Sequence, residues 1–269
     1  MTSRGRSPSS ATSPTTISSA SSRRSSPGTR ERGNVSAWLE MSAGQDLPLA
    51  LVYLELALAL TLLATVLHFR RTRKARAELA AVRLYFASFF GLGVLAPGLI
   101  VALTSAEPLA LLASWGWTFG RSGPGLMIVA AGLPLAVLAS AAGSRDPEMI
   151  RMYPFAKNAC SSMRTFLVYQ ASYVLLYYLP WEFIFRGVLF LPLVPAIGLL
   201  PALAVQTLVS TLFHIGHPDS EVFAAAGAGL LFGAIAWLTG SFFYTFVLHA
   251  AAGVATDTFL YRRRRTERS

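Results

Sequence analysis

The sequence has few charged residues and almost no cysteine. Only 13% of its 269 residues are charged, whereas 54% are hydrophobic. Cys160 is the single cysteine, so no intrachain disulfide is possible, and nothing around it indicates a catalytic thiol or a cysteine metal cluster. This balance lies outside that of soluble domains and indicates a polytopic integral membrane protein.

The formal net charge of +10 comes from clusters of Lys and Arg in tails and short loops. The clusters are the Ser- and Arg-rich start and residues 70–76, 145–164 and 262–265. Such clusters mark the cytoplasmic edges of membrane proteins and contact anionic lipid. We therefore expect the lipid bilayer as a partner and no nucleic acid.

Composition divides the chain into three regions. The first 40 residues are rich in Ser, Thr, Arg and Pro and cannot bury enough apolar surface to offset chain entropy, so we expect a disordered tail over residues 1–47. This start loosely resembles a transit peptide, and Met41 is an alternative translation start. Residues 48–261 are expected to form a transmembrane helical domain, followed by a basic tail over residues 262–269.

Apolar segments of membrane-spanning length predict an all-α bundle of about eight helices, because unpaired backbone amides in lipid are too costly for other structures. The segments are residues 49–69, 84–103, 125–142, 165–179, 180–195, 196–213, 222–238 and 242–261. The Trp- and Gly-rich segment 105–124 is expected to be interfacial, with Trp115 and Trp117 among the headgroups.

The basic clusters after the first and last spans both favour the cytoplasm, which requires an odd number of crossings. Eight crossings conflict with this. The conflict disappears if residues 180–195 make no independent crossing. It also disappears if the N-terminal tail stays inside and one of the two basic clusters is not cytoplasmic. We expect a cytoplasmic C-terminus.

Ionisable residues are scarce in the last third of the chain. A charge at the bilayer centre costs roughly 2.5–3.5 kcal/mol, so such residues usually face a protein interior or water and have partners. We therefore expect the segments that carry them to meet at one site. With tyrosines set aside, residues 165–261 contain Glu182, Arg186, His214, His217, Asp219, Glu221, His249 and Asp257.

Each of these residues also has a structural explanation. Glu182 and Arg186 have the i, i+4 spacing of an ion pair that neutralises both charges, and this interpretation suits Arg186 best. His217 and Asp219 flank Pro218 in a polar turn, where solvation is the simpler expectation. His249 lies mid-span without a neighbouring charge and is the hardest to explain structurally.

Three sequence stretches, "WEFIFRG", "FHIGHPDSE" and "HAAAGVATD", resemble the ordered motifs of the CAAX-protease and bacteriocin-processing membrane proteins, also called the Abi or Rce1-like family. They most resemble a bacterial subgroup that carries "WEFxFRG". The motif-bearing core is residues 153–261. The resemblance implies intramembrane peptide hydrolysis without a nucleophilic side chain, in which a Glu and a His activate water and a further His with an Asn or Asp stabilises the oxyanion.

Carried over by position, Glu182 matches the second Glu of the family's pair and Arg186 matches its Arg. We expect Glu182 to act as general base, with His214 as its helper and His249 as oxyanion donor. Asp257 completes the catalytic candidates, and Arg186, Glu221 and His217 support them.

Three positions depart from the family pattern. Trp181 stands where the family has its first Glu, which usually acts as the base. Gly253 stands four residues after His249, where the family has Asn or Asp. His217 fits the Phe-x-x-x-His motif literally from Phe213, but the subgroup pattern favours His214.

The expected activity is that of a membrane protease acting on a membrane-associated protein or peptide, in the bacterial inner membrane. The substrate is a prenylated-type C-terminal peptide, a bacteriocin leader or a C-terminal sorting tail. No cofactor is expected. A metalloprotease is an alternative in which His214, His249 and a carboxylate from Glu182, Glu221 or Asp257 bind a divalent metal, although no H-E-x-x-H pair is present. The other alternative is a non-catalytic membrane scaffold or immunity-type protein.

Overall fold

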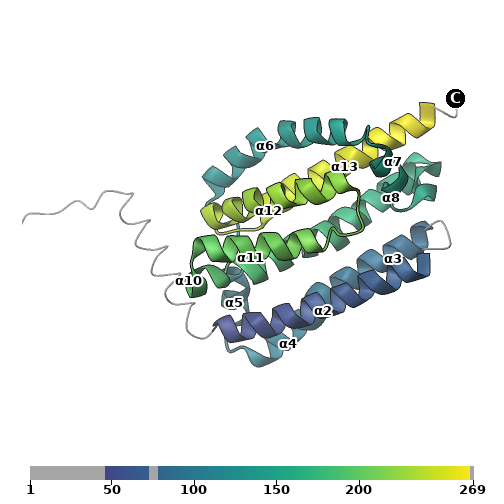
Figure 1. Ribbon diagram of the computed structural model, residues 1–269. Helices are drawn as coiled ribbons and strands as arrows, with labels where there is room; N and C mark the ends of the chain where they lie inside the picture. The colour runs from purple at the N-terminus through teal and green to yellow at the C-terminus, as the bar shows by residue number, and fades with distance from the viewer. Residues whose placement is uncertain (1–45, 73–77, 267–269) are drawn as a thin grey trace, which may run out of the picture. The chain divides into compact units, whose positions relative to one another are not determined.

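A computed structural model describes residues 46–72 and 78–266, so the predictions of a disordered tail over most of residues 1–47 and of a start at Met41 lie outside the described residues. The described chain is helical except for turns, loops and one isolated bridge between Ile215 and His217 (Figure 1). The α-helices are α2 (Asp46–Thr72), α3 (Leu79–Phe90), α4 (Ala96–Thr104), α5 (Pro108–Ser114), α6 (Ser122–Gly143), α7 (Pro147–Met152), α8 (Met163–Tyr173), α9 (Leu179–Glu182), α10 (Leu193–Ile197), α11 (Leu199–Leu212), α12 (Asp219–Thr239) and α13 (Phe243–Thr266). Shorter π-helical and 3₁₀ segments are η1 (Gly91–Leu95), η2 (Lys157–Ser161), η3 (Val174–Tyr178) and η4 (Phe183–Phe190).

Five helical stretches of the described chain are long and apolar enough to cross a membrane. They are Leu51–His68, Leu79–Thr104, Ser122–Gly143, Met163–Ile197 and Asp219–Thr239. The all-α membrane bundle is thus confirmed, whereas the count of eight is not. With the shorter helix α11 and the helix α13, which ends in arginines, the described chain has seven possible membrane crossings. An odd number of crossings agrees with the expectation that the basic clusters after the first and the last span are both cytoplasmic.

The predicted segments 165–179 and 180–195 are one continuous helical stretch of 35 residues, Met163–Ile197. Pro180 lacks an amide hydrogen, yet the chain continues through it as α9 between the π-helical turns η3 and η4, which change the hydrogen-bond register. Within this stretch 78% of the most apolar window is buried, far more than in any of the other four candidate spans. It is therefore the central element of the bundle.

Aromatic side chains pack the central stretch against α2 and α3. Phe86 of α3 stacks on Tyr173 with ring centroids 4.8 Å apart. Trp115, which caps α5, is fully buried and meets Tyr53 edge-on at 5.1 Å. Protein side chains therefore enclose the Trp115 ring, and its position at headgroup depth stays a prediction. The ring of Trp117 remains partly exposed.

Small residues allow close packing of the helices on the other side of the central stretch. The helix α6 lies along α13, and Ser140 Oγ donates a hydrogen bond to the Ala252 carbonyl across them at 2.8 Å (Figure 1). The pair α11 and α12 meets at Gly229, whose carbonyl accepts from Gln206 Nε2 at 2.6 Å. These two pairs bring α6, α12 and α13 together around the motif residues.

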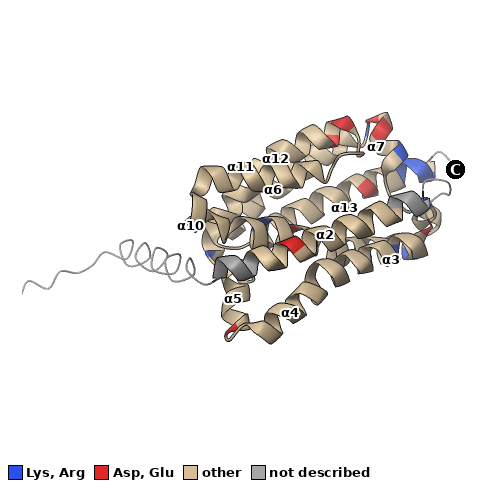
Figure 2. Cartoon of the chain, turned by 60° about the horizontal axis from the view of Figure 1, so that its bottom comes forward, with Lys and Arg blue, Asp and Glu red and all other residues tan. Residues whose placement is uncertain are grey.

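The C-terminal end of α13 is basic and lies beside α7, as the blue ribbon in Figure 2 shows. Arg264 Nη2 donates to the carbonyls of Ile150 and Tyr153 at 3.1 and 3.2 Å. The predicted tail boundary at residue 262 falls inside α13, which continues to Thr266. Arg264 therefore fixes the end of α13 to the segment that leads into the motif-bearing core.

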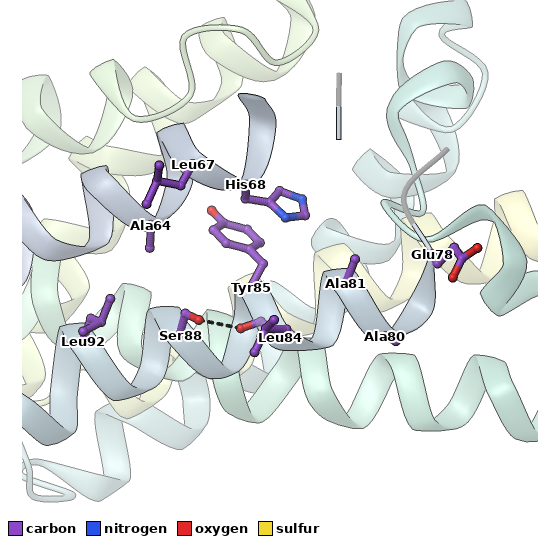
Figure 3. A pocket seen from close by; sticks show the side chains of 10 residues that line it. All are labelled: Ala64, Leu67, His68, Glu78, Ala80, Ala81, Leu84, Tyr85, Ser88 and Leu92. Carbon is purple, nitrogen blue, oxygen red and sulfur yellow. Dashed lines mark hydrogen bonds between the residues drawn. The ribbon is translucent and has the colours of Figure 1, made fainter. Parts of the chain in front are cut away.

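A cavity of about 480 Å³ lies between α2 and α3 (Figure 3). His68 and Tyr85 face each other there, with their rings stacked at 4.3 Å. The remaining lining is mostly Ala and Leu, and no residue of the three sequence motifs contributes to it. This cavity is separate from the site described next.

Candidate active site

Glu182 and His249 meet although they are 67 residues apart in the sequence. Glu182, at the end of α9, is fully enclosed, and its Oε1 lies 2.6 Å from Nδ1 of His249 on α13. A carboxylate only accepts, so Nδ1 carries the proton and donates it in this hydrogen bond. The other imidazole nitrogen, Nε2, is left free to accept.

The other oxygen of Glu182 faces Arg186. Oε2 lies 3.3 Å from Nε of Arg186, and the guanidinium is 3% exposed. The ion pair expected from the i, i+4 spacing is therefore present. Arg186 also lies over the ring of Phe232 at 5.5 Å, a favourable position for a cation. Oε1 of Glu182 is thus hydrogen-bonded to His249, whereas Oε2 has the ion-pair contact with Arg186 and no hydrogen bond.

A cavity of about 380 Å³ opens beside His249. Its polar lining includes His214, Glu221 and His249, and its walls are formed largely by Ala and Gly residues of α12 and α13. Glu182 does not line it. Since the side chain of His249 is 24% exposed and its Nδ1 is held by Glu182, the free Nε2 is the atom that can serve this cavity.

His214 follows the C-terminal end of α11 and reaches the same cavity. Its Nδ1 lies 2.8 Å from the Ser210 carbonyl, so Nδ1 is the donor and Nε2 the acceptor. Burial lowers the pKa of His214 to about 4, which keeps the ring neutral at pH 7. His214 therefore offers a neutral nitrogen acceptor near the cavity.

Glu221, in the first turn of α12, is the carboxylate that lines the cavity. Tyr153 Oη donates to its two oxygens at 2.7 and 2.8 Å, and His217 Nδ1 lies 3.0 Å from Oε1. Burial and the neighbouring Glu221 raise the pKa of Tyr153 well above its usual range, so its hydroxyl keeps the proton that it donates. His217 thus acts on Glu221 and is not part of the cavity lining.

One comparison with known families bears on this arrangement. The family model for type II CAAX prenyl endopeptidase Rce1-like proteins matches residues 164–255, which include all three motifs. This segment is similar to the Rce1-like family. No curated protein and no solved structure matches the sequence. The Rce1-like match implies a membrane-embedded protease of the CAAX type that acts on a peptide or protein in the membrane.

Trp181 lies in the matched segment, at the position where the sequence resemblance implies a Glu. Its ring is 3% exposed and lies edge-on to His214 at 5.0 Å and to His249 at 6.4 Å between centroids. The indole therefore separates and supports the two imidazoles. It brings no charge to the site.

Asp257 is the one catalytic candidate that lies outside the contacts around the cavity. It is 1% exposed and accepts from Gln170 Nε2 of α8 at 3.0 Å, while its neighbour Thr256 lines the cavity. Asp219 is exposed, as expected for a residue of a polar turn. The structure thus brings Glu182, His214, His249 and Glu221 together. Asp257 lies outside this group, against α8.

Two tyrosines of the site have no counterpart among the sequence candidates, which included no tyrosine. Tyr153 holds Glu221, and Tyr178 lines the cavity with its ring 4.7 Å from that of His249. Gly253 was the sequence signal for Tyr178, because a motif position without a side chain leaves space that a residue of another helix can fill. Among the described residues, no group of three His, Cys, Asp or Glu has the geometry of a metal site.

Proposed function

We propose that the protein is an intramembrane endopeptidase that hydrolyses a peptide bond with a water activated by the pair of Glu182 and His249. One observation carries the proposal: a fully buried carboxylate fixes Nδ1 of His249 while the same histidine lines a cavity with His214 and Glu221. A carboxylate that orients an imidazole stabilises the imidazolium formed when Nε2 takes a proton.

The first step is attack by water. Nε2 of His249 takes one proton of the water, and the neutral Nε2 of His214 accepts a hydrogen bond from the other. The water oxygen forms a bond to the carbonyl carbon of the substrate, and the carbonyl π pair moves onto oxygen. The imidazolium of His249 is stabilised by Glu182, whose second oxygen remains paired with Arg186.

The second step breaks the peptide bond. The oxyanion pair re-forms the carbonyl, the bond between carbon and nitrogen breaks, and the nitrogen takes the proton from His249. The products are a new carboxyl group and a new amine. Glu221, held by Tyr153, lies in the cavity and binds the departing amine.

This assignment changes the role first expected of Glu182. The sequence interpretation made it the direct base, with His249 as oxyanion donor. Both oxygens of Glu182 have partners and the residue does not line the cavity, so we assign it the orienting role and make His249 the group that takes the proton. We give Asp257 a structural role, because it bonds to Gln170.

We infer that the substrate is a membrane-associated peptide cut near the cytoplasmic face. The cavity includes residues from the end of α6, from α7 and from the start of α12, close to the basic end of α13. Basic residues favour the cytoplasm. From the resemblance to a bacterial subgroup, we propose that the protein lies in the bacterial inner membrane.

The test is cleavage by the purified protein in liposomes. Three reporters are offered, namely a prenylated C-terminal peptide, a leader peptide and a hydrophobic C-terminal sorting tail, and mass spectrometry locates any cut. We expect one reporter to be cut by the native protein and not by His249→Ala or His214→Ala. The matched control is His68→Ala, because His68 lines the other cavity. Equal cleavage by His249→Ala and the native protein would exclude this site, and a folded native protein that cuts none of the reporters favours the scaffold alternative.

A further inference from the structure

The third motif lacks its family side chain at Gly253, and the space is filled from another helix. A Cβ atom on Gly253 would overlap the hydroxyl of Tyr178 and lie 2.8 Å from Cε2 of the same ring. The hydroxyl of Tyr178 therefore occupies the position where the Asn or Asp of the family pattern would begin.

Tyr178 also faces the proposed chemistry. It ends η3, three residues before Trp181, and lines the cavity together with His249 and Gly253. Its ring lies 4.7 Å from that of His249 and 4.4 Å from that of Tyr173. The ring is 5% exposed, so its position is fixed by packing and its hydroxyl has little freedom to move.

The register of α13 sets the distance between the two groups. Residues four apart on a helix have Cβ atoms about 5–6 Å apart on one face. His249 and the hydroxyl at Gly253 therefore lie one turn apart along the cavity. Both groups line the same cavity, so a substrate carbonyl bound there can have the attacking water near His249 and its oxygen near the Tyr178 hydroxyl.

We propose that Tyr178 is a catalytic residue that donates a hydrogen bond from its hydroxyl to the oxyanion, in place of the missing Asn or Asp. The inference rests on the proposed function. When water attacks and the carbonyl π pair moves onto oxygen, Tyr178 Oη–H donates to that oxygen and keeps its proton. The bond weakens again when the pair returns and the carbon–nitrogen bond breaks. A donor of this kind acts mainly in the transition state, so it raises kcat and leaves KM nearly unchanged.

The first test is Tyr178→Phe, which removes one oxygen and keeps the ring. We expect kcat to fall by roughly 10²–10³-fold with KM within about twofold, as for the loss of one oxyanion donor. The thermal midpoint is measured in parallel to show that the variant is folded. Native kcat in Tyr178→Phe would overturn the inference while leaving the proposed function intact. Absence of cleavage by the folded native protein would overturn the proposed function itself.

The second test exchanges the two positions. Gly253→Asn alone should be inactive or poorly folded, because its Cβ overlaps the Tyr178 hydroxyl. Tyr178→Ala opens that space, so the double variant Tyr178→Ala with Gly253→Asn places an amide donor where the family has one. We expect the double variant to be at least tenfold more active than Tyr178→Ala. A double variant no better than Tyr178→Ala would refute the equivalence, because a purely structural tyrosine gives no such rescue.

Discussion

Replacing Glu182 by Gln is the substitution that separates the catalytic from the structural role of this carboxylate. The amide has the same shape but one oxygen and one nitrogen, and no charge. With its oxygen towards His249, its NH₂ group faces Arg186 Nε, which is also a donor. With its oxygen towards Arg186, its NH₂ donates to Nδ1 and moves the histidine proton to Nε2, the atom that must accept.

Either orientation removes the charge that stabilises the imidazolium. Loss of the equivalent carboxylate in a Ser-His-Asp enzyme lowers kcat by about 10⁴-fold through a wrong histidine tautomer. We expect Glu182→Gln to lower kcat by roughly 10³–10⁴-fold in the liposome cleavage assay. Glu182→Asp keeps the charge at a longer distance from His249 and should retain more activity than Glu182→Gln.

The same substitution leaves Arg186 without its ion partner at 3% exposure. Breaking one side of a buried pair costs about 3–5 kcal/mol, so the thermal midpoint of Glu182→Gln should also fall. The double variant Glu182→Gln with Arg186→Met removes the uncompensated charge and should recover stability without recovering cleavage. Cleavage at the native rate by Glu182→Gln would refute the assigned role, and recovery of activity together with stability in the double variant would show that the carboxylate acts only on folding.

Three further predictions concern other parts of the molecule. Glu221→Gln should lower kcat by roughly 10²-fold with intact membrane insertion, measured with the same reporter. Burial lowers the pKa of Lys157 from the ordinary 10.5 to about 8, so the folded state releases this proton first as the pH rises. The stability of the native protein should therefore increase between pH 8 and pH 10.5, and this increase should be smaller in Lys157→Met when thermal midpoints are compared. Gly187→Ala should lower the free energy of unfolding by roughly 1–3 kcal/mol, because its Cβ would lie 2.5 Å from the Trp115 carbonyl, whereas Gly227→Ala has open space and should not.

Much of the fold followed from composition and segment length. Apolar segments predicted the membrane helices, and the rarity of charge in the last third predicted a meeting point for Glu182, His214 and His249. The continuous helix through Pro180 was not predictable, because a proline normally argues for a break and the compensating π-helical turns depend on packing. The enclosure of Trp115 also depends on packing partners that are distant in sequence.

The details of the site were harder to predict than its members. The spacing of Glu182 and Arg186 indicated their ion pair, but it gave no sign that His249 forms a hydrogen bond with Oε1 of Glu182. Asp257 lies eight residues after His249, on roughly the same helix face, and still bonds to Gln170 in another layer. Side-chain direction and the choice of neighbour are tertiary properties, and a helical period alone does not determine them.

The exchange of Glu for Trp at position 181 also accounts for the charge balance of the site. A second carboxylate beside Glu182 would place two like charges next to one arginine in a dry interior, and one of them would have to stay protonated. With Trp181 there, Glu182 and Arg186 form a neutral pair, and the cavity receives its carboxylate from Glu221 on α12. Tyr153 and His217 supply the donors that this carboxylate needs. In the proposed function, Glu221 and Tyr178 on neighbouring helices therefore supply the carboxylate and the oxyanion donor that positions 181 and 253 lack.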